Sequence, residues 1–327
     1  MKRTSLIILA LLFGLHGCST ASTSPQWSTG VADDYPANRY LTAVGEGGSR
    51  EIAEQRALAA LARVFEVNIS EQSSDFSLFR SGTGEASEGS NRQVSSRQLI
   101  AATEQLIEGA SPVEYWQNKQ QHLVLVALER SGAEQRLRHK IGQLDQQTSG
   151  LSRYAAQEQL NSVVRISALE QARQLQRQRT PLNRNLSVVS AKQITAPISL
   201  AELEQRIRDQ LAGLRFQLAA DAQWLPQLQH AVGQIGARVL SSSELQLSGT
   251  VEREPVTQRQ GWFWLRGSLQ LTLSNSAGTV IAQQRLPVKI SAQQAGLIEQ
   301  RLHDRINSDI ANQLYRLLTS TRVETEL

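Results

Sequence analysis

The chemistry of Cys18 is defined more closely by the neighbouring residues than that of any other residue. It is the only cysteine among 327 residues, so the chain can form no internal disulfide and no cysteine-based zinc site. A short basic segment, residues 1–3, and an apolar run, residues 6–15, precede it. An apolar run of about ten residues is too short to cross about 30 Å of hydrocarbon as a helix. Together the two segments are typical of a secretory signal peptide.

The residues directly before this cysteine resemble a bacterial lipobox. Leu15 stands three positions before Cys18, and the small residue Gly17 stands directly before it, whereas His16 departs from the small or aliphatic residue usual between them. The resemblance implies that residues 1–17 are removed and that Cys18 becomes a lipidated N-terminus, with the covalent lipid as the only cofactor. At about 0.8 kcal/mol per buried CH₂, three acyl chains form an effectively permanent anchor. An ordinary signal peptide that is cleaved elsewhere is the alternative.

Ser19 bears on the membrane to which the lipid would attach. In the sorting pattern of lipoproteins in bacteria with two membranes, Asp at this position retains the protein in the inner membrane, whereas Ser permits export. We therefore expect a location on the periplasmic face of the outer membrane. Residues 18–26 are mostly small and polar and predict a flexible acylated tether. No later segment contains about 18 continuous apolar residues, so we expect no other membrane span.

The rest of the sequence contains no recognised catalytic or metal-binding motif. No His-x-x-x-His, His-Glu-x-x-His or Gly-x-Ser-x-Gly is present, and Asp33-Asp34 has no evident second partner for acid–base chemistry. We therefore expect no catalytic residues, no metal ligands and no enzymatic activity, with an envelope hydrolase as the least favoured alternative. The histidines of the mature chain are scattered: His122, His139, His230 and His303.

A glycine-rich segment at residues 45–48 lies between a predicted strand and a predicted helix, where a phosphate-binding loop would also lie. Arg50 occupies the place of the last glycine of a dinucleotide-binding loop. We interpret the segment as a tight turn that ends the strand.

The densest aromatic cluster is Trp262-Phe263-Trp264. Side chains alternate between the two faces of a strand, so the two tryptophans share one face and Phe263 shares the other with Leu265. Two arrangements remain open. Exposed Trp262 and Trp264 would form a surface for a glycan or a protein partner; otherwise they lie beneath the last helix as part of the core.

The elements that would position these residues predict an α+β fold of two small domains. The first domain covers residues 27–130, with a strand at 39–45, a helix that begins after the N-cap Ser49, and a hairpin at 112–128. Residues 123–128 form the most apolar run of this domain, which predicts a central strand.

Residues 131–185 predict a helical connector. Ser131 and Glu134 match a capping box, apolar residues recur at helical spacing, and Pro181 is expected to end the helix. The pattern leaves open whether the connector is one long helix or a hairpin bent at residues 149–150. It also leaves open whether the connector packs on a neighbouring domain or forms a coiled-coil spacer or an oligomer contact.

The second domain covers residues 186–320, and a polar tail follows at 321–327. It begins with a predicted short strand at 186–190, and the capping box of Ser199 and Glu202 opens a helix. Three strands with period-two patterning and a final amphipathic helix follow; the strands cover 245–252, 263–274 and 279–290, and the helix 292–318.

The charge balance argues against a nucleic-acid partner. The chain has 34 Lys and Arg against 30 Asp and Glu side chains, a formal net charge of +4. Loss of Lys2 and Arg3 with the signal peptide leaves 32 basic against 30 acidic residues, or +2. So small a surplus, without dense basic runs, does not follow a phosphate backbone.

A strand, a glycine and an alanine-rich helix form a recognisable combination in the first domain. Trp27, then a strand ending in Val44-Gly45, then a helix with Ala53 and Ala57 resemble the Lpp-twenty family of bacterial envelope lipoproteins over residues 26–130. Several members of that family belong to the outer-membrane part of the flagellar motor, and no catalytic residues are known in it. The resemblance implies a structural or assembly factor whose partners are envelope proteins, including flagellar or secretion components.

The second domain is similar to periplasmic α+β domains of TolB N-termini and of curli-secretion lipoproteins. The similarity rests on residues 247–251, followed by a hairpin and a long helix. The leading expectation is thus a non-enzymatic, outer-membrane-anchored lipoprotein that acts through protein contacts. The alternative is a lipoprotein that binds peptidoglycan or another polysaccharide through Trp262 and Trp264.

Overall fold

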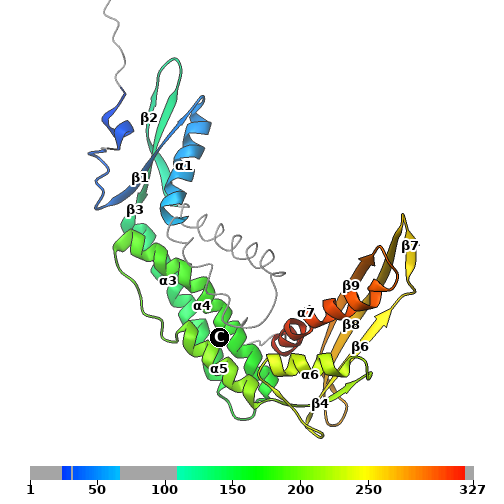
Figure 1. The fold of residues 1–327 in the computed structure, drawn as a ribbon. Helices are drawn as coiled ribbons and strands as arrows, with labels where there is room; N and C mark the ends of the chain where they lie inside the picture. The colour runs from blue at the N-terminus through cyan, green and yellow to red at the C-terminus, as the bar shows by residue number, and fades with distance from the viewer. Residues whose placement is uncertain (1–23, 31, 67–108, 321–327) are drawn as a thin grey trace, which may run out of the picture. The chain divides into compact units, whose positions relative to one another are not determined.

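The computed structural model describes residues 24–30, 32–66 and 109–320 (Figure 1). The predicted signal peptide, Cys18, Ser19, most of the tether and the polar tail lie outside the described residues. The chain divides into two compact units, Met1–Leu61 with Ala110–Leu128 and Ala62–Gly109 with Glu129–Leu327. Both units contain helix and strand, so the predicted α+β class is confirmed.

The first unit is built on a three-stranded sheet in the order β1-β3-β2. Its elements are a short 3-10 helix (Gln26–Thr29), β1 (Tyr40–Gly47), α1 (Arg50–Glu66), β2 (Ala110–Gln117) and β3 (His122–Glu129). The apolar strand β3 is central as predicted, and its residues 123–128 are all buried. The Ile52 N–H donates to the Ser49 hydroxyl at 3.3 Å, so the predicted N-cap of α1 is confirmed.

Gly45 is the point of close approach between α1 and β1. A Cβ at this position would overlap the Ala53 carbonyl oxygen and the Ala57 nitrogen. Glycine is therefore required, and the fully buried Ala53 and Ala57 let the helix backbone come this near. The prediction that Gly45 ends the strand is wrong. Strand β1 continues to Gly47, because Gly45 lies beneath α1 and does not form the turn that precedes this helix.

The second unit begins with a helical hairpin. Helices α3 (Arg130–Ala155) and α4 (Ser162–Ser190) pack along each other, and α5 (Leu200–Gly213) packs beside α4 (Figure 1). The Asn161 side chain caps α4 by accepting from the Val164 N–H at 2.9 Å. Of the two arrangements that the sequence left open for the connector, the structure has the hairpin. The predicted position of its bend is wrong, because residues 149–150 are helical and the bend lies at 156–161.

Two predictions for α4 are wrong. Pro181 lies inside this helix instead of ending it. Proline removes one backbone hydrogen bond, but packing against α3 holds the helix through it. Residues 186–190, predicted as a strand, are the last turns of α4. Leu182, Leu186 and Val189 are buried at helical spacing, which explains why the helix continues.

The predicted capping box of α3 is also wrong. The helix begins at Arg130, so Ser131 is already helical. The Ser131 hydroxyl donates to Glu129 Oε1 at 2.9 Å, and Glu134 pairs with Arg138 at 2.8 Å. The matching box of α5 forms in part: the Glu202 N–H donates to the Ser199 hydroxyl at 3.1 Å.

The remainder of the second unit is a six-stranded sheet with two helices on one face (Figure 1). The strand order is β5-β4-β6-β8-β7. Strands β6 and β7 pair with successive parts of one edge of β8, and β9 pairs along its other edge. The elements are β4 (Arg215–Ala220), α6 (Leu225–Gln234), β5 (Arg238–Val239), β6 (Leu245–Arg253), β7 (Thr257–Arg259), β8 (Trp262–Asn275), β9 (Val280–Ala292) and α7 (Leu297–Thr319).

The inner face of this sheet and the helices share one core. Leucines of β8 alternate toward α6 and α7, and the apolar face of α7 covers them, as the period-two and helical patterns predict. The buried members include Leu247, Leu265, Leu269, Leu271, Leu273, Ile290, Ile298, Leu302, Ile306 and Ile310. The other face carries polar side chains along β6, β8 and β9, many of them exposed.

Candidate binding surfaces

The structure places Trp262 and Trp264 on the sheet face that points away from α6 and α7. Their neighbour Leu265 points to the core and is 2% exposed, and Phe263 packs against that core. Trp262 is 38% exposed, and Trp264 is half-buried. The final helix therefore does not cover this pair.

Three cationic side chains lie close to the two tryptophans on this face. In the strand register, Arg259 on β7 lies opposite Trp262, and Arg266 on β8 lies opposite Lys289 on β9. The Lys289 ammonium lies 5.0 Å from the centroid of the Trp264 ring, within the range of a cation–π interaction. We call these five residues the tryptophan–cation patch.

The cations of the tryptophan–cation patch have no acidic partner. All three are exposed, and none forms an ion pair with another residue in the described part of the chain. Arg285 provides the contrast, because it lies on the same face of β9, four residues before Lys289. It donates to Glu252 at 2.9 Å and to the Ser268 hydroxyl at 2.9 Å. The carboxylate of Glu252 on the neighbouring part of the face is thus already engaged.

The first unit has an acidic hollow of about 240 Å³ beside its sheet. Asp33, Asp34 and Glu114 line it together with Trp27 and Tyr35. Burial, followed by the negative charges of Glu114 and Asp34, raises the pKa of the Tyr35 hydroxyl. The sequence offered no second partner for Asp33-Asp34, and the structure supplies Glu114 from β2. Three carboxylates with two aromatic rings can receive a cationic side chain of a partner protein.

A buried charge network lies between α4, α5 and α7. The Arg173 guanidinium donates to Glu170 Oε1 at 2.7 Å, and the Tyr315 hydroxyl donates to Glu170 Oε2 at 2.7 Å. Glu204 on α5 lies 3.9 Å from Arg173 and 3.7 Å from Arg177. Glu170 and Arg173 are each 5% exposed. Burial, followed by the charge of Glu170, raises the pKa of Tyr315, so this hydroxyl stays a donor at all physiological pH.

A second buried pair links the two helices of the hairpin. Arg179 on α4 donates to Asp145 on α3 at 2.7 Å and to the Ile194 carbonyl at 2.8 Å. Gln176 donates to the same carboxylate at 3.0 Å and to the Thr148 hydroxyl at 3.1 Å. These partners bind each other and leave no open reactive group, so we assign both networks to the fold.

The four histidines have four separate environments. The Nδ1 of His122 lies 2.6 Å from the Tyr115 hydroxyl, the His139 ring contacts Gln143, and His303 stacks on Trp224 with ring centroids 4.4 Å apart. Across residues 24–30, 32–66 and 109–320, no three His, Cys, Asp or Glu residues gather as metal ligands. No helix in those ranges is long and apolar enough to cross a membrane.

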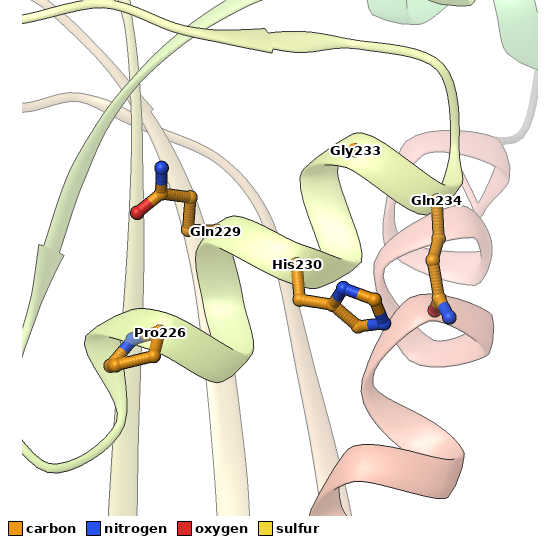
Figure 2. Close-up of a pocket in the computed structure, with 5 residues that line it drawn as sticks. All are labelled: Pro226, Gln229, His230, Gly233 and Gln234. Atoms are coloured by element: carbon orange, nitrogen blue, oxygen red, sulfur yellow. The ribbon is translucent and has the colours of Figure 1, made fainter.

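The fourth histidine, His230, lines a shallow hollow on the surface of α6. Figure 2 shows that all five lining residues come from this helix; they are Pro226, Gln229, His230, Gly233 and Gln234. The set offers an imidazole and two amides but no carboxylate, thiol or hydroxyl. It therefore lacks a nucleophile with an activating base, and we assign no chemistry to it.

Sequence reasoning identified the tryptophans but missed the three cations beside them. Arg259 and Arg266 lie within four residues of a tryptophan, and alternation alone places Arg266 on the same face. Lys289 is 25 residues beyond Trp264, and only the register of the β8–β9 hairpin brings it over the ring. A count from the Asn275–Gly278 turn would have placed Val288 opposite Arg266, because the register shifts between Leu273 and Ser274, so the turn alone does not reveal Lys289.

Comparison with known proteins supports the resemblance seen in the sequence. Residues 25–129 match the family model described as LPP20 lipoprotein, which confirms the Lpp-twenty resemblance for this part of the chain. The match begins at residue 25, in the last two residues of the predicted acylated tether. None of the curated protein sequences matches the chain.

Two solved structures are similar to parts of the chain. The secreted protein HP1454 from the human pathogen Helicobacter pylori is 16% identical, with 86% of this chain and 97% of that chain covered and a TM-score of 0.43. A minor lipoprotein from Acinetobacter baumannii is 17% identical, with 32% of this chain and 90% of that chain covered and a TM-score of 0.27. Neither similarity is close enough to carry an argument.

Proposed function

We propose that the protein is a non-enzymatic lipoprotein of the bacterial envelope, anchored through Cys18 and acting by contact with other envelope proteins. The observation that carries the proposal is the LPP20 lipoprotein match, which begins at residue 25, a few residues after the lipobox and at the end of the short tether. Two independent parts of the sequence thus support the same class of protein.

The proposed address is the periplasmic face of the outer membrane. Ser19 supports it through the sorting pattern, and a small polar tether leaves the two folded units free to reach partners near that surface. Anchoring restricts the protein to one surface and raises its effective concentration for a partner on the same surface. The acidic hollow of the first unit offers a contact for a basic side chain of such a partner. A flagellar or secretion assembly is the partner class that the family resemblance favours.

Metabolic labelling with palmitate tests the anchor. Wild type should incorporate label, and Cys18→Ala should incorporate none. Equal labelling of both would overturn the lipoprotein proposal. Ser19→Asp is the matched test of the address, because it keeps the lipid and changes only the sorting position. It should move the labelled protein from the outer-membrane to the inner-membrane fraction, and an unchanged distribution would contradict the proposed address.

Binding of peptidoglycan or another polysaccharide is the second candidate function. The exposed Trp262, on a sheet face that α6 and α7 leave open, favours it. Aromatic rings stack well on the apolar faces of sugars and remain soluble when only partly exposed. Sedimentation with purified sacculi should carry wild type into the pellet and leave most of Trp262→Ala in solution. Absence of wild type from the pellet would remove peptidoglycan as the ligand.

A further inference from the structure

We propose that the tryptophan–cation patch binds an acidic polysaccharide, a sugar polymer that carries carboxylate or phosphate groups. The inference rests on the second candidate function and names the chemistry of its ligand. It is independent of the lipid anchor, because the binding surface belongs to the folded second unit.

Uncompensated positive charge is the first observation. Arg266 and Lys289 lie directly opposite each other on neighbouring antiparallel strands, an arrangement in which like charges repel and destabilise the sheet. Arg259 adds a third exposed cation on the same face. Arg285 shows that a carboxylate partner can be built into this face, since Glu252 neutralises it. Glu254 follows β6 beside Arg266 but forms no ion pair with it in the described residues. The pair of Arg266 and Lys289 therefore retains a repulsion that an anionic ligand would relieve.

The aromatic rings explain why the ligand is a sugar polymer and not a simple anion. Trp262 presents an exposed ring to the solvent, which is suited to stacking on a sugar. The ammonium of Lys289 lies against the second ring, Trp264. A cation held beside an aromatic platform can bind the acidic group of a sugar whose ring stacks on the neighbouring tryptophan.

The polar residues further along the same face favour a long ligand. Gln270 and Thr272 continue the outward row of β8 beyond Arg266, and Gln283 lies opposite Thr272 on β9. These amides and hydroxyls are partly or fully exposed and can exchange hydrogen bonds with sugar hydroxyls. An anionic membrane surface is less well matched, because Trp262 is the only member of the patch among the exposed large apolar side chains of the described residues.

Binding of oligogalacturonate to the full-length protein in detergent tests the inference, with the methyl ester of the same oligosaccharide as the uncharged probe. Wild type should bind the acid at least about tenfold more tightly than the ester, and added NaCl should weaken the binding. Trp262→Ala, and the double variant Arg266→Gln with Lys289→Gln, should each weaken it at least about tenfold.

Arg285→Gln is the matched control, because it removes a cation from the same face of the same strand that already has an acidic partner. It should change the affinity less than about twofold. Equal binding of acid and ester, or an equal loss in Arg285→Gln and in Lys289→Gln, would overturn the acidic-ligand inference. Binding of wild type to phosphatidylglycerol vesicles but not to oligogalacturonate would also overturn the inference. Sacculus binding that persists in those cases would leave the second candidate function standing.

Discussion

Two groups of charged residues in the second unit differ in burial and in whether each charge has a partner. Around α4, Glu170 and Arg173 are buried and bonded to each other. On the open sheet face, Arg266 and Lys289 are exposed and opposed to each other, and neither forms an ion pair in the part of the chain that the structure describes. A buried charge without a partner would cost several kcal/mol, so pairing is a condition of folding there. An exposed unpaired charge costs little and remains available to a ligand.

Removal of one partner from the buried network should have the largest effect on stability. Arg173→Met leaves Glu170 buried beside Tyr315 without its cation, and we expect the free energy of unfolding to fall by about 3–5 kcal/mol. Urea unfolding of the full chain measures it. Arg138→Met is the matched control: it breaks an ion pair of similar length, 2.8 Å, between side chains that are 42% and 29% exposed, and should cost less than about 1 kcal/mol.

The double variant Glu170→Leu with Arg173→Met sharpens that test. Replacing both ions by apolar side chains removes the uncompensated charge, so it should be more stable than Arg173→Met alone. If the single and double variants are equally unstable, the loss comes from packing, and this charge pairing is not what stabilises the contact of α4 with α5 and α7.

A smaller and pH-dependent effect is expected at Tyr315. Its hydroxyl donates to a carboxylate, so Tyr315→Phe should cost about 1.5–3 kcal/mol near neutral pH. The folded state raises the pKa of this hydroxyl above its ordinary value of 10.0, so the stability that depends on the neutral form is complete below pH 10 and is lost as the pH rises further. Above that pH the wild type should lose about 1.4 kcal/mol per pH unit through this group.

The comparison of unfolding curves at pH 8 and pH 11 checks this linkage. The stability difference between wild type and Tyr315→Phe should shrink or change sign at the higher pH. A difference that stays constant would show that the hydroxyl ionises equally in both states, and would contradict its burial against Glu170.

The contrast between the two groups also marks what the sequence could predict. Local patterns were sufficient for the apolar strand β3, the N-cap Ser49 and the shared face of Trp262 and Trp264, because each depends on residues within a few positions. Glu170 and Arg173 are three residues apart on a helix, which in sequence is typical of a solvated ion pair. Their burial arises from α5 and α7, which come later in the chain.

Long-range contact likewise explains the failures. Pro181 is a reliable helix breaker only where nothing packs around it, and α3 supports α4 there. Gly45 indicates a turn by composition, yet its function is to admit the backbone of α1, which becomes evident only when helix and strand are brought together. The cations of the tryptophan–cation patch were missed for the same reason, since the register of β8 and β9 unites them.

The double variant Glu254→Gln with Arg266→Glu tests most directly whether the patch is maintained for binding at the expense of stability. It converts the like-charge pair of Arg266 and Lys289 into an opposite-charge pair across β8 and β9. The change at Glu254 is needed because the N–H of this residue donates to the Arg266 carbonyl, so its carboxylate would otherwise lie beside the new one. Measured on one preparation, the free energy of unfolding should rise by about 0.2–1 kcal/mol, while oligogalacturonate binding should fall at least about tenfold. A variant that unfolds more easily than wild type, or that binds the acidic oligosaccharide as well, would contradict the account.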